Sequence, residues 1–87
     1  GFGELHAAGA LDTKTKELIA LSIGIAVHCN GFIVFHVHDA LKAGANRQEI
    51  LETIGVAILM RGGPSMAYGC EALEALEQFE KAQDLPL

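Results

Sequence analysis

Tryptophan is absent from the 87-residue sequence, tyrosine occurs once, and six lysines and arginines stand against eleven aspartates and glutamates. Nucleic-acid-binding domains usually present a basic surface with aromatic side chains for stacking. Long apolar runs are also missing: the longest one, residues 18–27, contains Ser22 and Gly24 and falls well short of the ~20 residues that span a bilayer. We therefore expect no nucleic-acid partner and no membrane-spanning segment.

Cysteine is scarce as well, since the chain has only Cys29 and Cys70. Two cysteines are too few for the disulfide framework that holds small secreted domains together. The first residues also lack the charged and apolar regions of a secretory signal peptide. We therefore expect a reducing, cytoplasmic environment for this chain.

Apolar side chains, by contrast, are abundant: 51% of the residues are hydrophobic and the mean hydropathy is +0.32. A chain of this length forms one domain, residues 1–87, and so small a domain buries only part of its surface. Apolar surface that stays exposed on one subunit is typical of interfaces between subunits. We therefore expect a homo-oligomer.

Helix signals dominate the first half of the chain, and strand-like alternation is missing. Asp12 is a good N-cap and predicts a first helix over residues 13–28, which is apolar nearly all round and is therefore expected to be buried. Turn-forming residues predict a short break at residues 29–31. A second helix is expected over residues 31–43, ended by Gly44.

The second half of the chain predicts two more helices. Asn46, followed three residues later by Glu49, fits a capping box, and the third helix is expected to run to about Met60. Pro64 suits the first turn of a fourth helix that continues through Phe79. The sequence therefore predicts an all-α fold, a compact helical bundle of four main helices, with a partial N-terminal helix as a further option.

Reactive side chains gather around the start of the second helix. Because successive helical residues are about 100° apart, Cys29, Phe32 and His36 form one stripe, and His38 points to the opposite side. A lone cysteine on an apolar face is usually a structural residue. The spacing of these groups matches no standard zinc site, so we expect no bound metal.

Glu17, in the first helix, is the other residue of chemical interest. It lies along the same line of that helix as Gly24 and His28. A glutamate near a helix start is often favoured there by the helix dipole alone. About three turns separate Glu17 from Cys29 along the helix, so the packing of another helix or another subunit would have to bring the two side chains together.

Taken together, these residues resemble the AhpD-like members of the carboxymuconolactone decarboxylase family. The family signature is a glutamate, a Cys-x-x-Cys motif that begins twelve residues later, and a histidine four residues after the second cysteine. Glu17, Cys29 and His36 match this signature. The similarity covers about residues 11–80 and includes Lys16–Leu21, Cys29–Val37, Ala40–Ala45, Arg47–Ile50, Gly62–Pro64 and Tyr68–Gly69.

Position 32 departs from the family pattern, because Phe32 stands where AhpD-like peroxidases have their second, nucleophilic cysteine. The resemblance implies that Glu17 and His36 belong to a proton relay that promotes thiolate formation, and that Cys29 is the surviving thiol. It implies no bound cofactor. A disulfide within the motif cannot form, and nothing in the spacing favours Cys70 as a substitute.

Three hypotheses follow for the function. The first is a thiol-dependent hydroperoxide reductase that uses an external thiol reductant and, as the resemblance implies, forms trimers or hexamers. The second is a lyase of the decarboxylase type, in which a histidine and acidic groups move protons and Arg47 or Arg61 would have to bind the substrate carboxylate. The third, motivated by Phe32, is a non-catalytic or ligand-binding homo-oligomer. The first requires that Glu17, Cys29 and His36 converge on one pocket between packed helices.

Overall fold

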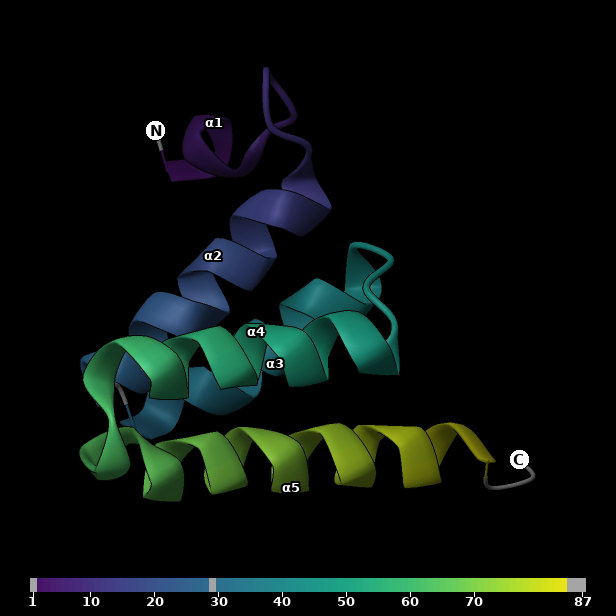
Figure 1. Ribbon diagram of the computed structural model, residues 1–87. Coiled ribbons are helices and arrows are strands. Elements are labelled where there is room, and N and C mark those ends of the chain that lie inside the picture. Colours follow the sequence, from purple (N-terminus) through teal and green to yellow (C-terminus); the bar gives the residue numbers. More distant parts are fainter. Residues whose placement is uncertain (1, 29, 85–87) are drawn as a thin grey trace.

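Helices make up the fold of the described part of the chain, residues 2–28 and 30–84, in the computed structural model (Figure 1). The elements are α1 (Phe2–His6), α2 (Thr13–Ala26), α3 (Asn30–Lys42), α4 (Arg47–Arg61) and α5 (Met66–Asp84), with a 3-10 turn, η1 (Gly63–Ser65), before α5. These described residues contain no strand. The prediction of an all-α bundle with four long helices and a short N-terminal one is therefore confirmed.

Local sequence signals determine where several helices begin and end. The Asp12 carboxylate caps α2 and accepts a hydrogen bond of 2.7 Å from the backbone N–H of Thr15. Asn46 and Glu49 form the predicted capping box of α4, each side chain accepting the other residue's backbone N–H at 2.9 Å. Beyond α3, Gly44 has a φ of +103°, which glycine adopts without a steric penalty.

Helix α2 occupies the centre of the packing, because it contacts both α3 and α4 (Figure 1). Helix α5 packs along α3 and α4, while α1 lies apart from the bundle and contacts α2. The core side chains with no exposed surface are Leu21, Ile25, Ile33, Val37, Ala40, Ile50, Ala72 and Leu76. Burying one leucine or isoleucine side chain stabilises a fold by about 1.5–3 kcal/mol, so this core fixes α2 against α3.

The prediction that the first helix is buried all round was wrong for the single chain. Ile19 and Ile23 of α2 and Val27, which directly follows it, are 43%, 55% and 61% exposed, respectively. The reason is geometric: α3 and α4 cover one side of α2, where Leu21 and Ile25 lie, and no described helix covers the other. One chain therefore leaves an apolar strip of α2 uncovered.

Two predicted boundaries also need correction. Helix α2 ends at Ala26 and α3 begins at Asn30, so the break lies earlier than residues 29–31. Pro64 belongs to η1 and not to the first turn of α5, which starts at Met66. The fixed φ of proline suits a 3-10 turn, and Gly62, with a φ of +76°, ends α4 just before it.

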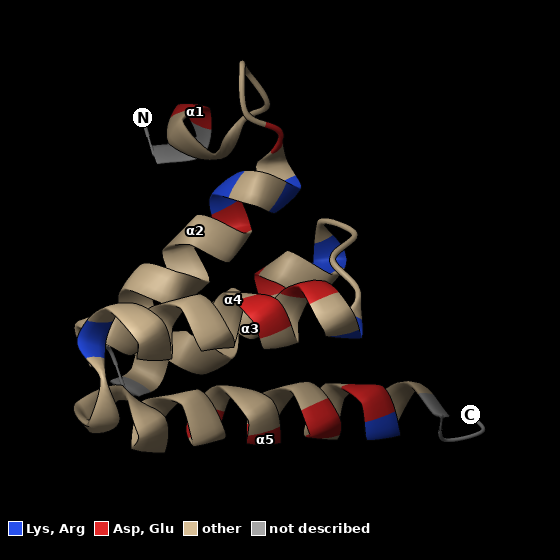
Figure 2. Ribbon diagram, viewed as in Figure 1, with Lys and Arg blue, Asp and Glu red and all other residues tan. Residues whose placement is uncertain are grey.

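Charged side chains avoid one part of the molecule. No aspartate, glutamate, lysine or arginine occurs within residues 18–38, and Figure 2 shows most of α2 and the beginning of α3 without charge. Charges gather instead at the start of α2, near the end of α3 and along α5. In residues 2–28 and 30–84, no helix is both long and apolar enough to cross a membrane.

Candidate functional site

Glu17 is a buried carboxylate in the second turn of α2, with 4% of its surface exposed. Its Oε1 atom lies 2.6 Å from Nδ1 of His6, at the end of α1. Its Oε2 atom is also buried and has no hydrogen-bond partner among the described residues. The Glu17 carboxylate therefore has one oxygen bound to an imidazole and one oxygen available for a further donor.

A hollow of about 390 Å³ opens beside Glu17, where the start of α2 faces the end of α3. Thr13, Asp39, Lys42 and Ala43 line it together with Glu17. Charged side chains of both signs therefore border the hollow. Sequence reasoning identified Glu17 but did not identify this environment, because it depends on the register of α3 against α2.

His36 lies on α3 with its ring against Gly24 of α2. A Cβ atom at position 24 would lie 3.3 Å from Cδ2 of His36, a tighter contact than most Cβ atoms make. The absence of a side chain at Gly24 therefore makes room for the imidazole. Nδ1 of His36 is buried and has no hydrogen-bond partner in the described part of the chain.

The two proposed relay residues lie at different levels of the α2–α3 interface. Gly24, which packs on His36, follows Glu17 by seven residues, or about 10 Å along the helix axis. The fully buried Leu21 lies between them on α2, and no hydrogen bond joins Glu17 to His36 directly. Cys29 lies outside the described residues, so the convergence of all three groups stays a prediction.

Phe32, at the position of the missing second cysteine, is 62% exposed. Its ring centroid lies 6.5 Å from that of His36 and 6.4 Å from that of Phe35. The ring therefore borders the imidazole on the outside of α3 and does not fill an interior cavity.

His28 was noted in the sequence but was not among the predicted catalytic residues. Its φ is +60°, and it is the only non-glycine residue with positive φ in the described ranges. Its ring stacks on Tyr68 of α5, with centroids 4.1 Å apart and planes 8° from parallel, and its buried Nε2 has no described partner. Strained backbone often marks functional sites. The signal in the sequence was the place of His28 directly before Cys29.

The remaining candidates lie away from the α2–α3 interface. His38 contacts Phe79 of α5 and Asp39, which confirms that it points away from His36. Cys70 is a free, exposed thiol on α5. Among the described residues, no three histidines, cysteines or carboxylates are grouped as a metal site would require.

A surface ion pair joins the first turns of α2 and α4. Nζ of Lys14 lies 2.8 Å from Oε2 of Glu49. The hydrogen bond from Lys14, followed by the one from the Asn46 backbone N–H, lowers the pKa of the Glu49 carboxyl. The same contact with Glu49 raises the pKa of Lys14. The pair ties the charged ends of both helices together.

The all-α fold agrees with the resemblance seen in the sequence. The model of the carboxymuconolactone decarboxylase family matches residues 1–75. The chain therefore belongs to the carboxymuconolactone decarboxylase family.

Two solved structures of this family are similar to the chain. A protein of Legionella pneumophila, determined in its apo form, is 51% identical, has a TM-score of 0.83, and is matched over 91% of this chain and 74% of its own. A protein of Thermotoga maritima, whose involvement in the antioxidative response has been suggested, is 27% identical with a TM-score of 0.88. The match covers 93% of this chain and 84% of the Thermotoga protein.

Two curated bacterial proteins without an assigned role are also similar. Protein 4 in the cox locus of Paracoccus denitrificans is 40% identical over 78 residues, which are 90% of this chain and 70% of that protein. A protein of Cupriavidus necator is 35% identical over 65 residues, which are 75% of this chain and 58% of that protein. Both relatives are longer than the chain described here.

Proposed function

We propose that this protein is a thiol-dependent hydroperoxide reductase in which Cys29 is the reacting thiol. Family membership and the spacing of Glu17, Cys29 and His36 support the proposal. One structural observation carries it: Oε2 of Glu17 and Nδ1 of His36 are buried polar atoms without a described partner, both at the α2–α3 interface. Because an unpaired buried polar atom is costly, each one calls for an explanation, and a catalytic role is one such explanation.

In the proposed reaction, the Cys29 thiolate attacks the terminal oxygen of a hydroperoxide, R–O–O–H. A sulfur–oxygen bond forms and the oxygen–oxygen bond breaks, so Cys29 becomes a sulfenic acid and the leaving alkoxide takes a proton to become R–OH. One external thiol then condenses with the sulfenic acid and releases water. A second external thiol displaces Cys29 from the mixed disulfide and leaves as the oxidised reductant.

The external thiol is needed because Phe32 cannot supply the second sulfur of the motif. Glu17 and His36 would remove the proton from the thiol and return a proton to the alkoxide. Glu17 and His36 lie at different levels of the α2–α3 interface. A proton moving between them would therefore pass through an intervening group, such as a substrate oxygen or a bridging water.

Hydroperoxide consumption with a thiol reductant tests the proposal. The wild-type protein is compared with Cys29→Ser and with Cys70→Ser, which removes the exposed thiol on α5. We expect Cys29→Ser to lose all thiol-dependent turnover and Cys70→Ser to keep it. Equal rates in the wild type and in Cys29→Ser, or no consumption by the wild type with any thiol, would contradict the proposal.

A second variant restores the family motif. In Phe32→Cys, we expect a disulfide with Cys29 to form on oxidation and turnover to rise, because a resolving thiol then lies within the same chain. The exposed position of Phe32 means that this substitution removes no core contact. Activity that appears only in Phe32→Cys would show that the wild-type chain lacks a working nucleophile.

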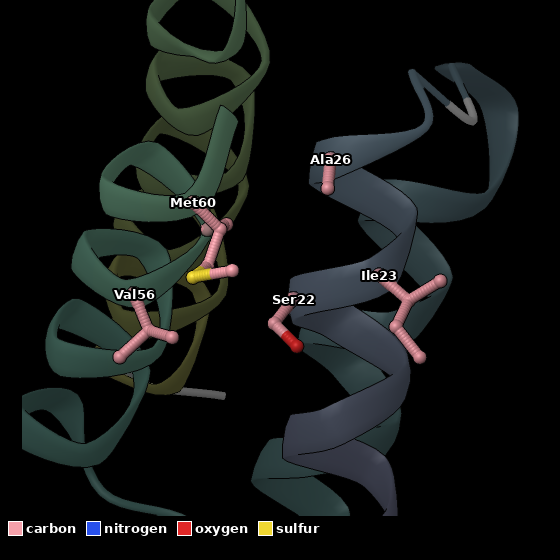
Figure 3. Close-up of a pocket in the computed structure, with 6 residues that line it drawn as sticks. Ser22, Ile23, Ala26, Val56 and Met60 are labelled. Carbon is pink, nitrogen blue, oxygen red and sulfur yellow. The ribbon is translucent and has the colours of Figure 1, made fainter. Parts of the chain in front are cut away.

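We also propose that the chain forms a homo-oligomer, a trimer or a hexamer, through the apolar groove between α2 and α4. Figure 3 shows Ser22 and Ala26 of α2 across from Val56 and Met60 of α4. This hollow of about 180 Å³ adjoins a second one of about 200 Å³, which also reaches Ser22 and Val56. Val56 and Met60 are 53% and 75% exposed in the single chain, and such apolar surface favours a second copy.

Sedimentation velocity at micromolar concentration tests this part of the proposal. We expect Ile23→Glu, which puts a charge next to the groove, to shift the wild-type oligomer toward smaller species. Gln78→Glu, on the exposed side of α5, is the matched control and should leave the oligomer intact. A wild-type protein that sediments as a stable monomer would contradict it.

A further inference from the structure

The contact between His6 and Glu17 joins an exposed group to a buried one. The His6 side chain is 54% exposed, whereas the Glu17 side chain is 5% exposed. At 2.6 Å between Nδ1 and Oε1, the two atoms share one hydrogen-bonded proton. The imidazole therefore gives the carboxylate inside the bundle a hydrogen-bonded connection to the surface.

The first turn of α2 holds α1 in the position that this contact requires. Nζ of Lys16 donates to the carbonyl oxygens of Leu5 and Ala7 at 3.2 and 2.8 Å, and Oγ1 of Thr13 donates to that of His6 at 3.0 Å. Carbonyl groups at a helix end have no partner within the helix, so a lysine there satisfies them. Three consecutive carbonyls are bound in this way, and the His6 ring is thereby held over Glu17.

We infer that His6 is a positioning residue for Glu17 that also carries its proton to and from solvent. The inference deepens the proposed function, since it rests on Glu17 as a member of the proton relay. Over one cycle the two external thiols supply the protons that appear in the alcohol and in water, so protons must pass between the incoming thiols and the buried relay. His6 provides a titratable group for that exchange, because an imidazole can hold a proton on either nitrogen near neutral pH.

Other charged groups near Glu17 do not replace His6. Asp39 and Lys42 of α3 line the hollow beside Glu17, and Lys16 is bound to the carbonyls of α1. None of the three makes a hydrogen bond to the Glu17 carboxylate. The His38–Asp39 pair provides a useful contrast, because its side chains are 55% and 46% exposed and its contact is 3.2 Å long.

Nuclear magnetic resonance of the full chain tests the contact without reference to turnover. Free neutral histidine favours the tautomer with the proton on Nε2; we expect neutral His6 to carry it on Nδ1, bound to Glu17. We also expect the resonance of the Glu17 carboxyl carbon at neutral pH to move in His6→Asn, because an amide replaces the imidazole that contacts Oε1. An Nε2–H tautomer, or a Glu17 resonance unchanged in His6→Asn, would overturn the inference.

Measuring the turnover of His6 variants distinguishes a role in proton exchange from a purely structural role. His6→Asn keeps a short hydrogen-bond donor but cannot exchange a proton, and His6→Ala keeps neither property. We expect both to reduce hydroperoxide turnover about tenfold and both to regain activity with free imidazole in solution. If His6→Asn kept full activity and only His6→Ala lost it, His6 would have a purely structural role. That result would overturn the inference that His6 exchanges a proton with solvent.

Two controls complete the design. His38→Asn removes the more exposed histidine and should leave turnover and its pH profile unchanged. Lys16→Met keeps His6 but loosens α1, and we expect it to reduce turnover by less than His6→Asn does. If the wild type shows no turnover at all, the proposed function fails, and the resonance measurements still decide the inference about His6.

Discussion

The two ends of the α2–α3 pair offer different environments to the two proposed relay residues. At one end, the Glu17 carboxylate contacts His6 and borders a hollow lined by the charged side chains of Asp39 and Lys42. At the other end, the His36 ring packs on Gly24 within a stretch, residues 18–38, without a single charged side chain. The acid therefore lies at the charged end and the imidazole at the apolar end.

Because their surroundings differ, the two ends of the α2–α3 pair are expected to have different roles in the proposed reaction. The Glu17 carboxylate is connected to the surface through His6, while the His36 ring lies in apolar surroundings. His28, stacked on Tyr68, lies at the same apolar end and directly precedes Cys29 in the sequence. The proposed oxidation of the thiol belongs to the apolar end, and proton exchange belongs to the charged end.

The largest expected effect comes from the residue between the two ends. Leu21 is fully buried on α2 between Glu17 and Gly24. Leu21→Ala should lower the free energy of unfolding by about 2–5 kcal/mol, because it removes buried methyl groups and leaves a cavity. Ile23→Ala, on the uncovered side of the same helix, should cost about 1 kcal/mol or less in a monomeric sample. Urea denaturation measures both, and equal losses would contradict the packing described here.

The next effect tests whether the two ends act together. His36→Gln and Glu17→Gln are each expected to reduce hydroperoxide turnover about 100-fold, because each removes a proton-transfer group. If both belong to one relay, the double variant should be no slower than the worse single variant. Steady-state kinetics of the three variants measures this coupling. Strictly multiplicative losses would show that the two ends act independently.

A smaller effect concerns the apolar end alone. Tyr68→Leu removes the ring that stacks on His28 and should lower the free energy of unfolding by about 0.5–1.5 kcal/mol. Tyr68→Phe keeps the ring and should stay close to the wild type. Thermal denaturation of both variants decides the matter. A Tyr68→Phe protein as unstable as Tyr68→Leu would mean that the hydroxyl, and not the stacking, supplies the stability.

The smallest effect concerns the charged end. Lys14 lowers the pKa of the Glu49 carboxyl from its ordinary value of 4.5, so the pair adds stability that is present above that pH. The contribution is lost as pH falls below about 4.5 and Glu49 takes up a proton. The stability of Lys14→Met should therefore fall less steeply with acid than that of the wild type, by a small margin because the pair is exposed. Identical acid profiles would contradict this assignment.

The sequence was sufficient to predict the helices and several of their ends. The caps at Asp12 and Asn46 and the glycine at position 44 are local signals, because the groups that they satisfy lie within a few residues. Pro64 was misplaced because its preferred φ suits both a helix start and a 3-10 turn. The exposed apolar strip of α2 was not predicted, because a high share of apolar residues in a helix does not show which side of that helix the other helices cover.

The candidate site was less accessible to sequence reasoning. The spacing of Glu17 and His36 came from the family signature, and the structure adds their different levels along the α2–α3 interface. The bond from His6 to Glu17 joins residues eleven positions apart through the docking of a short helix. This contact could not be predicted from the sequence, because it depends on how Thr13 and Lys16 bind the carbonyl groups of α1.

The most direct test of the account is the site of oxidation within the protein. The wild-type chain is treated with one equivalent of hydroperoxide in the presence of a reagent that traps sulfenic acids, and peptide mass spectrometry locates the adduct. We expect an adduct on Cys29 and little or none on Cys70, although Cys70 is exposed. Labelling confined to Cys70, or absent from both cysteines, would contradict the proposal that Cys29 is the reacting thiol.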